Sequence, residues 1–273
     1  MIYQISLDLM HFVFGILMLL FFVLVSTIGL FLLIRGNQRK LNNIITMGFA
    51  FLAMTIGFLM QFLIKEYGFL IREILSLIGF TFIIVFTNMT FYRHKSHLRN
   101  YLLIIGILLA INQFVFQLFV DYITPNNRFI HYTKIALDLP FNLLVFNWMA
   151  FAAYSSYIKL RNESITPWVI TRYKLIALSS FIMSFHSIPE FFQPFEIPMG
   201  DPSNIASLLV LGFISTISLI FVLLFGLAWI MPNWLKNMIN RDYTPIKEES
   251  YSDNELMELI KNQLTKRELY GNI

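Results

Sequence analysis

Three pairs of polar residues, each spaced four positions apart, stand inside otherwise apolar stretches of the sequence. The pairs are Gln113 and Gln117, Asp138 and Asn142, and His186 and Glu190. Because residues four apart share one face of an α-helix, each pair presents its side chains in one direction. Carboxylates, amides and imidazoles in apolar surroundings can bind a small polar ligand or ligate a metal. Ionisable groups within a membrane span are functional candidates for this reason.

We expect these pairs to converge on one polar pocket between neighbouring helices. Asp138, Asn142, His186 and Glu190 would line it and bind a ligand, with Gln117 assisting. Two prolines support an opening there: Pro140 withholds an amide from Ala136, as Pro189 does from Phe185, so either helix could kink. The alternative interpretation is that these groups are solvated helix ends and that the glutamines only bond neighbouring helices.

A metal site is an alternative hypothesis for some of the same residues. His11, Asp138, His186 and Glu190 are ligand types that zinc accepts. No HExxH motif is present and the four residues come from three separate segments, so we predict no metal and no catalytic residue. The absence of cysteine also excludes disulfides, thiolate zinc sites and cysteine nucleophiles. We predict that the protein is not an enzyme.

The elements that must position these residues follow from composition. Of the 273 residues, 57% are hydrophobic and 13% charged, against about 25% charged in soluble domains. A helix needs about 20 mostly apolar residues to cross a bilayer, and seven runs meet or approach that length. They cover residues 9–34, 44–64, 69–91, 101–120, 135–158, 168–189 and 205–230. The predicted fold is therefore all-α: a polytopic bundle of seven transmembrane helices over residues 1–231, whose partner is the lipid bilayer.

Basic residues set the expected orientation. Sixteen of the twenty Lys and Arg residues fall in the first, third and fifth connections, at the adjoining start of the sixth run or in the C-terminal tail. Because cytoplasmic loops carry the excess of Lys and Arg, we place the N-terminus outside the cell membrane and the C-terminus in the cytoplasm. Arg172 and Lys174, near the start of the sixth run, would snorkel to the inner interface. The polar pairs then fall in the outer half of the membrane.

The tail, residues 232–273, is polar and contains one amphipathic segment. Ser252 and Glu255 have the spacing of a capping box, and they precede an apolar stripe of Leu256, Leu259, Ile260 and Leu264. We expect a helix at about 253–268. It could dock on the loops or self-associate, bind a cytoplasmic protein, or remain a loosely ordered tail. We predict no nucleic-acid partner, because LTKREL at residues 264–269 resembles only the opening of a helix-turn-helix.

In topology, seven spans with the N-terminus outside resemble rhodopsins and G-protein-coupled receptors, and also microbial seven-transmembrane sensor or receptor-like proteins. Retinal is not expected as a cofactor, because run 205–230 has no lysine for a Schiff base. The Asp-Arg-Tyr motif of animal receptors is absent, since the chain reads TFYRHK after the third run. Their Asn-Pro-x-x-Tyr motif is also absent from the end of the seventh run. Seven-span sugar transporters resemble it in count, but their Pro-Gln pair is missing.

These observations lead us to predict a sensor or receptor-like membrane protein for signal transduction. A small extracellular ligand would bind the outward pocket, the sixth span would move about Pro189, and the cytoplasmic loops and tail would report the change. One alternative is a small-solute transporter or channel, which would need polar groups that continue through the inner half. Another is an intramembrane metal-dependent hydrolase.

Overall fold

The computed structural model describes residues 2–64, 66–92, 97–123, 127–163, 165–241, 243, 257, 258 and 260–262, and within them every regular element is helical. In chain order these are α1 (Ile2–Gln38), α2 (Asn42–Leu63), α3 (Gly68–Phe91), α4 (His97–Leu118), the π-helical turn η1 (Phe119–Ile123), α5 (Arg128–Arg161), α6 (Pro167–Met183), the 3₁₀ turn η2 (Pro189–Phe192), α7 (Ile205–Ile230) and α8 (Asn233–Ile239).

Six of these helices are long and apolar enough to cross a membrane, namely α2, α3, α5 and α7 with the Leu7–Gln38 part of α1 and the Arg99–Leu118 part of α4. They confirm the all-helical prediction and indicate a multi-pass integral membrane protein. The α6 helix has 17 residues, about 25 Å at 1.5 Å per residue. This is short of the hydrocarbon thickness of about 30 Å, so helix length establishes neither the predicted sixth span, 168–189, nor the count of seven spans.

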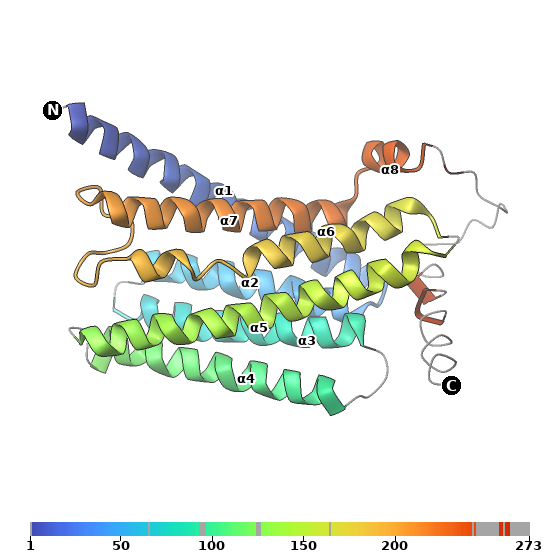
Figure 1. Ribbon diagram of the computed structural model, residues 1–273, viewed down its shortest axis with the longest axis horizontal. Coiled ribbons are helices and arrows are strands. Elements are labelled where there is room, and N and C mark those ends of the chain that lie inside the picture. Colours follow the sequence, from blue (N-terminus) through green and yellow to red (C-terminus); the bar gives the residue numbers. More distant parts are fainter. Residues whose placement is uncertain are drawn as a thin grey trace.

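The long helices run side by side along one axis, and successive helices alternate in direction (Figure 1). The α1 helix packs against α2 and α7, α3 lies between α2 and α4, and α6 lies between α5 and α7. The connections α2–α3, α4–α5 and α6–α7 therefore meet at one end of the bundle. The connections α1–α2, α5–α6 and α7–α8 meet at the other end (Figure 1).

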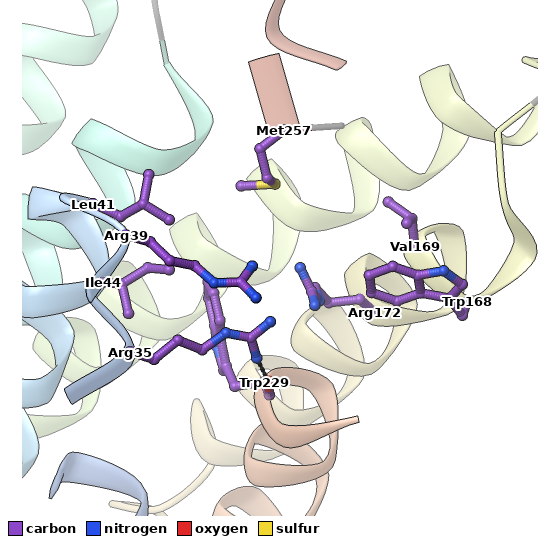
Figure 2. Close-up of a pocket in the computed structure, with 9 residues that line it drawn as sticks. All are labelled: Arg35, Arg39, Leu41, Ile44, Trp168, Val169, Arg172, Trp229 and Met257. Carbon is purple, nitrogen blue, oxygen red and sulfur yellow. Dashed lines mark hydrogen bonds between the residues drawn. The ribbon is translucent and has the colours of Figure 1, made fainter. Parts of the chain in front are cut away.

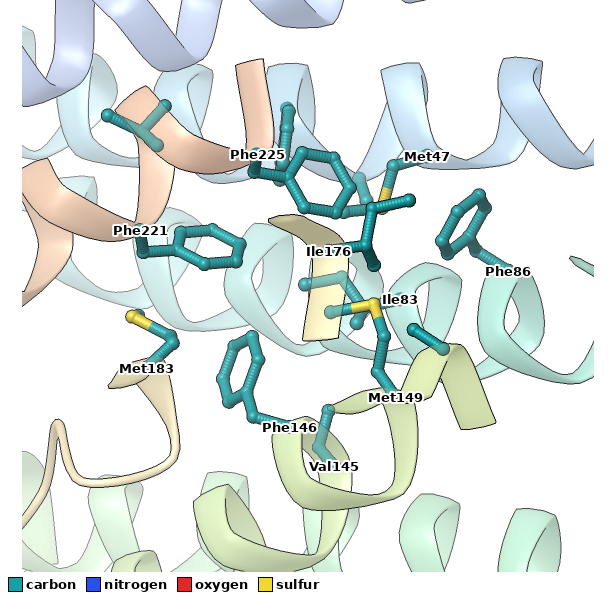
Figure 3. Close-up of a cluster of buried hydrophobic side chains, with 14 of the residues drawn as sticks. Met47, Ile83, Phe86, Val145, Phe146, Met149, Ile176, Met183, Phe221 and Phe225 are labelled. Atoms are coloured by element: carbon teal, nitrogen blue, oxygen red, sulfur yellow. The ribbon is translucent and has the colours of Figure 1, made fainter. Parts of the chain in front are cut away.

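The centre of the bundle is an aromatic and aliphatic core. Side chains from α2, α3, α5, α6 and α7 meet there, as Figure 3 shows. Phe221 of α7 lies with its ring centre 5.7 Å from that of Phe146 in α5 and 5.4 Å from that of Phe225. This contact between separate helices holds the middle of the bundle together.

The outer surface is also apolar, which agrees with lipid as the solvent. Large hydrophobic side chains are exposed on every long helix, including Phe12, Phe62, Phe151 and Phe213, each more than 60% exposed. Extended apolar surface of this kind is not tolerated on soluble monomers. The described surface therefore fits a bilayer.

Helices α1 and α2 cross at two glycines that allow their backbones to approach. A Cβ atom at Gly48 would lie 3.0 Å from the carbonyl oxygen of Gly29 and 2.8 Å from Cγ of Leu33. Both distances are shorter than ordinary van der Waals contact. Small residues at helix crossings are a common device of membrane proteins, where close packing replaces the hydrophobic effect.

The sixth helical segment differs from the expected span 168–189, because α6 ends at Met183. The Ser180 hydroxyl bonds the Ile176 carbonyl at 2.7 Å and the Ser184 hydroxyl bonds the Phe181 carbonyl at 2.7 Å. Such back-bonding competes with the helix ladder and bends helices, and Pro189 lies one turn later. The chain continues in tighter turns up to η2.

Those turns keep the backbone hydrogen-bonded. The amides of His186, Ile188 and Glu190 donate to carbonyls three residues earlier, at 3.0, 3.1 and 3.2 Å. The Phe185 carbonyl, which Pro189 was expected to leave without a donor, receives the amide of Ile188. Residues 184–192 are thus a tightened continuation of α6, whereas Pro140 stands inside an unbroken α5.

Most of the predicted tail helix at 253–268, with the capping box before it, lies outside the described residues. Residues 257, 258 and 260–262 are helical. Ile260 is only 2% exposed, and it packs in a cluster with Trp168, Tyr173 and Met231. Ile260 of the tail thus packs against the bundle, whereas the helix at 253–268 and its role stay predictions.

Candidate functional site

A buried lysine between two carboxylates is the main polar feature of the bundle. Nζ of Lys134 lies 2.7 Å from a carboxylate oxygen of Asp138, one turn later in α5. The same Nζ lies 3.3 Å from Oε2 of Glu190 in η2. The three side chains are 16%, 3% and 14% exposed, respectively. Lys134 thus ties the α6–η2 segment to α5 at what we call the carboxylate end of the bundle.

A second link between the same two segments lies one turn deeper. Nδ2 of Asn142 donates to Oγ of Ser187 at 2.6 Å and to the backbone carbonyl of Asp138 at 3.0 Å. Asn142 and Ser187 are both buried. The charged link of Lys134 and Glu190 is therefore backed by a neutral one, and both join α5 to the stretch that follows the end of α6.

The sequence places these groups together through local geometry. Asn127 caps α5 by accepting the Ile130 amide at 3.2 Å, so the helix begins before Lys134. Lys134, Asp138 and Asn142 then recur every fourth residue and share one face. On the other segment, Ser187 and Glu190 are three residues apart, which brings them together in the tight turns of residues 184–192.

Further polar groups surround this cluster from neighbouring helices. Gln113 of α4 approaches the Asp138 carboxyl. Glu73 of α3 lies within electrostatic range of Lys134, but Arg72 donates to it from both Nε and a terminal nitrogen. His131 and His186 both lie within electrostatic range of Glu190 and Lys134.

The cluster has a net charge, and some of its polar atoms have no hydrogen-bond partner within it. Lys134, Asp138 and Glu190 sum to one excess negative charge when all are ionised. Oδ1 of Asp138 and Nε2 of His131 are buried without a hydrogen-bond partner among the described residues. Because buried polar atoms are nearly always paired, the cluster is suited to an added proton, a water molecule or a small cation.

The structure brings together some of the predicted site residues and separates others. Asp138, Asn142 and Glu190 belong to the cluster, and His186 lies beside it, half-buried. Gln117 is half-buried near the end of α4, whereas it is Gln113, one turn earlier, that approaches Asp138.

His11, the fourth metal candidate, lies in a different contact. Its Nδ1 donates to the carbonyl of Gly200 at 2.8 Å, which ties α1 to the loop before α7. In that loop, hydrogen bonds from Ser203 hold the pKa of Asp201 below its usual range. Among the described residues, no three His, Asp or Glu side chains gather in a way that could hold a metal.

Sequence reasoning missed Lys134 and Ser187. Lys134 is one of the four basic residues outside the segments predicted to be cytoplasmic, and no site role is predicted for it. Its spacing of four from Asp138 was the available signal, because such pairs interact on a helix. Ser187 lies between two residues that were selected, but nothing in the sequence shows that its hydroxyl faces Asn142.

The chain matches no protein-family model, no curated protein and no solved structure.

Proposed function

We propose that this protein is a membrane sensor of receptor-like type, in which a small cation acts on the cluster of Lys134, Asp138 and Glu190. In this proposal the chain crosses the membrane seven times, with α6 and residues 184–192 together forming the sixth crossing. The carboxylate end and the N-terminus face outward, and the tail is cytoplasmic. The turn hydrogen bonds made by most amides of residues 184–192 support this crossing, because lipid tolerates only satisfied backbone.

The observation that carries the proposal is the Lys134 bridge. Charged side chains within membrane helices are costly and raise a functional hypothesis by default, and here three of them lie together with at most 16% of each side chain exposed. Apolar residues of the same volume often serve stability as well as a buried ion pair does. A functional requirement therefore accounts for this cluster better than packing does.

The geometry also gives a way for the cluster to act. A cation or proton that neutralises Glu190 competes with Lys134, and the charged link from α5 to η2 is then lost. The tight turns after Ser184 are the natural hinge, since short 3₁₀ stretches within helical segments often mark hinges. The α6 helix continues from there to Arg172, near the docked part of the tail, so movement of the segment would reach the opposite end of the bundle.

The test uses the absence of cysteine in the natural sequence. Phe129 at the start of α5 and Phe192 at the end of η2 are both over 70% exposed. Cysteines introduced at these two positions can carry spin labels. Pulsed electron paramagnetic resonance should show a shifted or broader distance distribution after Lys134→Met. Lys174→Gln, which removes a charge at the far end of α6, should leave it unchanged. An unchanged distribution in Lys134→Met contradicts the proposal.

Transport is the second candidate, and the discontinuity of α6 favours it. Transporters commonly build substrate sites from interrupted helices, and here the interruption adjoins buried Asn142. Uptake of radiolabelled methylammonium into reconstituted vesicles separates the two functions. A sensor gives a saturable spectroscopic response to methylammonium or protons without flux. A transporter accumulates the label, and Asp138→Asn reduces the uptake.

A further inference from the structure

Three arginines from separate segments converge on one cavity at the end of the bundle opposite the carboxylate cluster. Arg35 comes from α1, Arg39 from the turn that follows it, and Arg172 from α6. Figure 2 shows their guanidinium groups pointing into the same space. The cavity measures about 20 Å³. We call this region the arginine end.

Two of these guanidinium groups are held in fixed orientations. Arg35 donates to the carbonyl of Trp229 at 2.7 Å, and Nε of Arg172 donates to the carbonyl of Ala228 at 3.1 Å. Both acceptors are in the last turn of α7. Arg172 also stacks over the Trp168 ring at 4.8 Å and lies 5.7 Å from that of Trp229. Arg172 is only 7% exposed, which is far deeper than a snorkelling arginine.

Positioned guanidinium groups are suited to phosphate. Their planar forks bind phosphate oxygens in bidentate fashion, and several of them in one cavity match the charge of a phosphate mono- or diester. The cavity lies at an end of the helical bundle (Figure 1), which is the level of the phosphate-bearing headgroups in a bilayer. Basic pockets between membrane helices bind such headgroups.

The tail lies against the same cavity. Met257 is one of the residues that line it, as Figure 2 shows. Ile260, one turn later, is buried against Trp168 and Met231. At about 20 Å³ the space is sufficient for roughly one water molecule, so a larger group enters only when the tail segment moves away.

We propose that the arginine cavity is a binding site for a phosphate group and that the tail at Met257 and Ile260 competes with this ligand by covering the cavity. The site shares no residue with the Lys134 cluster. It therefore does not rest on the sensor proposal, and either can fail while the other stands. The shared chemistry allows two sources of the phosphate: the headgroup of an anionic phospholipid or a soluble phosphate.

The experiment measures binding to the full-length protein purified and stripped of lipid. Native mass spectrometry would measure binding of phosphatidylglycerol to the protein, with phosphatidylcholine as the comparison lipid. Pyrophosphate binding would be measured as a shift in the melting temperature of the protein. We expect phosphatidylglycerol to bind, with affinity reduced about tenfold or more in Arg172→Gln, as loss of a charged hydrogen-bond donor implies. Lys174→Gln is the matched control, because Lys174 is exposed on the same helix two residues away.

Three further variants keep the test decisive. If Arg172→Gln fails to fold, the half-buried Arg35 and Arg39 provide Arg35→Gln and Arg39→Gln, which should show the same loss. Ile260→Asn, which detaches the tail without changing charge, should strengthen binding several-fold. Binding of pyrophosphate alone would assign the site to a soluble phosphate. Equal losses in Arg172→Gln and Lys174→Gln, or no binding of either probe, would overturn the proposal.

Discussion

Replacing Lys134 with methionine is the perturbation whose size follows most directly from the structure. Its Nζ lies 2.7 Å from Asp138 and 3.3 Å from Glu190. At an effective dielectric constant of about 20, unit charges at these distances attract by roughly 6 and 5 kcal/mol. Desolvation offsets most of that attraction. The net cost of removing the shared partner of a buried pair is about 3–5 kcal/mol, and we expect Lys134→Met to lose that much stability.

The two carboxylates should cost less when each is neutralised alone. Asp138→Asn leaves Lys134 with Glu190, and Glu190→Gln leaves it with the shorter and more buried contact to Asp138. The expected order of destabilisation is therefore Lys134→Met, then Asp138→Asn, then Glu190→Gln. The triple variant should recover much of the stability of the natural sequence, because no unpaired charge remains.

Reversible unfolding in mixed detergent micelles measures these free energies, and a double-mutant cycle between positions 134 and 190 isolates their coupling. Residues in direct contact are expected to couple by about 0.5–3 kcal/mol. Additive single variants would show that the Lys134–Glu190 contact contributes nothing. A Lys134→Met protein as stable as the natural one would refute the electrostatic argument itself.

Two other predictions concern the packing around the site. Asn142→Ala should lower the free energy of unfolding by about 0.6–1.7 kcal/mol, the range of interhelical hydrogen bonds in membranes, because it removes the bond to Ser187. Asn147→Ala is the control in the same unfolding assay. It should give a smaller change, because Asn147 makes no interhelical side-chain bond among the described residues. Gly48→Val should destabilise the α1–α2 crossing by about 1–3 kcal/mol through overpacking, whereas Gly15→Ala, with nothing within 4 Å, should have little effect on the melting temperature. Equal effects of the two glycine variants would disprove the close-crossing argument.

Much of the architecture was predictable because apolar length alone limits what a helix in lipid can be. The spans expected at 44–64 and 69–91 fall within two residues of α2 and α3. The span expected at 135–158 was too short, since α5 begins at Arg128. Lys134 had the character of a loop residue in the sequence, but its pairing with Asp138 one turn later permits the helix to include it.

The remaining differences arise from tertiary contacts that spacing does not encode. The end of α6 at Met183 depends on serine hydroxyls that bond the helix backbone, a competition that hydropathy does not register. Glu190 meets Lys134 only because the turns after Ser184 redirect it. Arg172, expected to extend towards the membrane surface, is buried between two indoles instead.

The most direct test of the proposed seven-crossing sensor is the side of the membrane on which the two ends of α6 lie. Ser203 and Asn162 are exposed in the connections after and before the α6 segment, and each can be replaced by a single cysteine in this cysteine-free chain. A membrane-impermeant maleimide applied to intact cells should label Ser203→Cys at once and Asn162→Cys only after permeabilisation. Labelling of both from the same side would show that α6 does not cross, and the reverse pattern would place the Lys134 cluster on the cytoplasmic side.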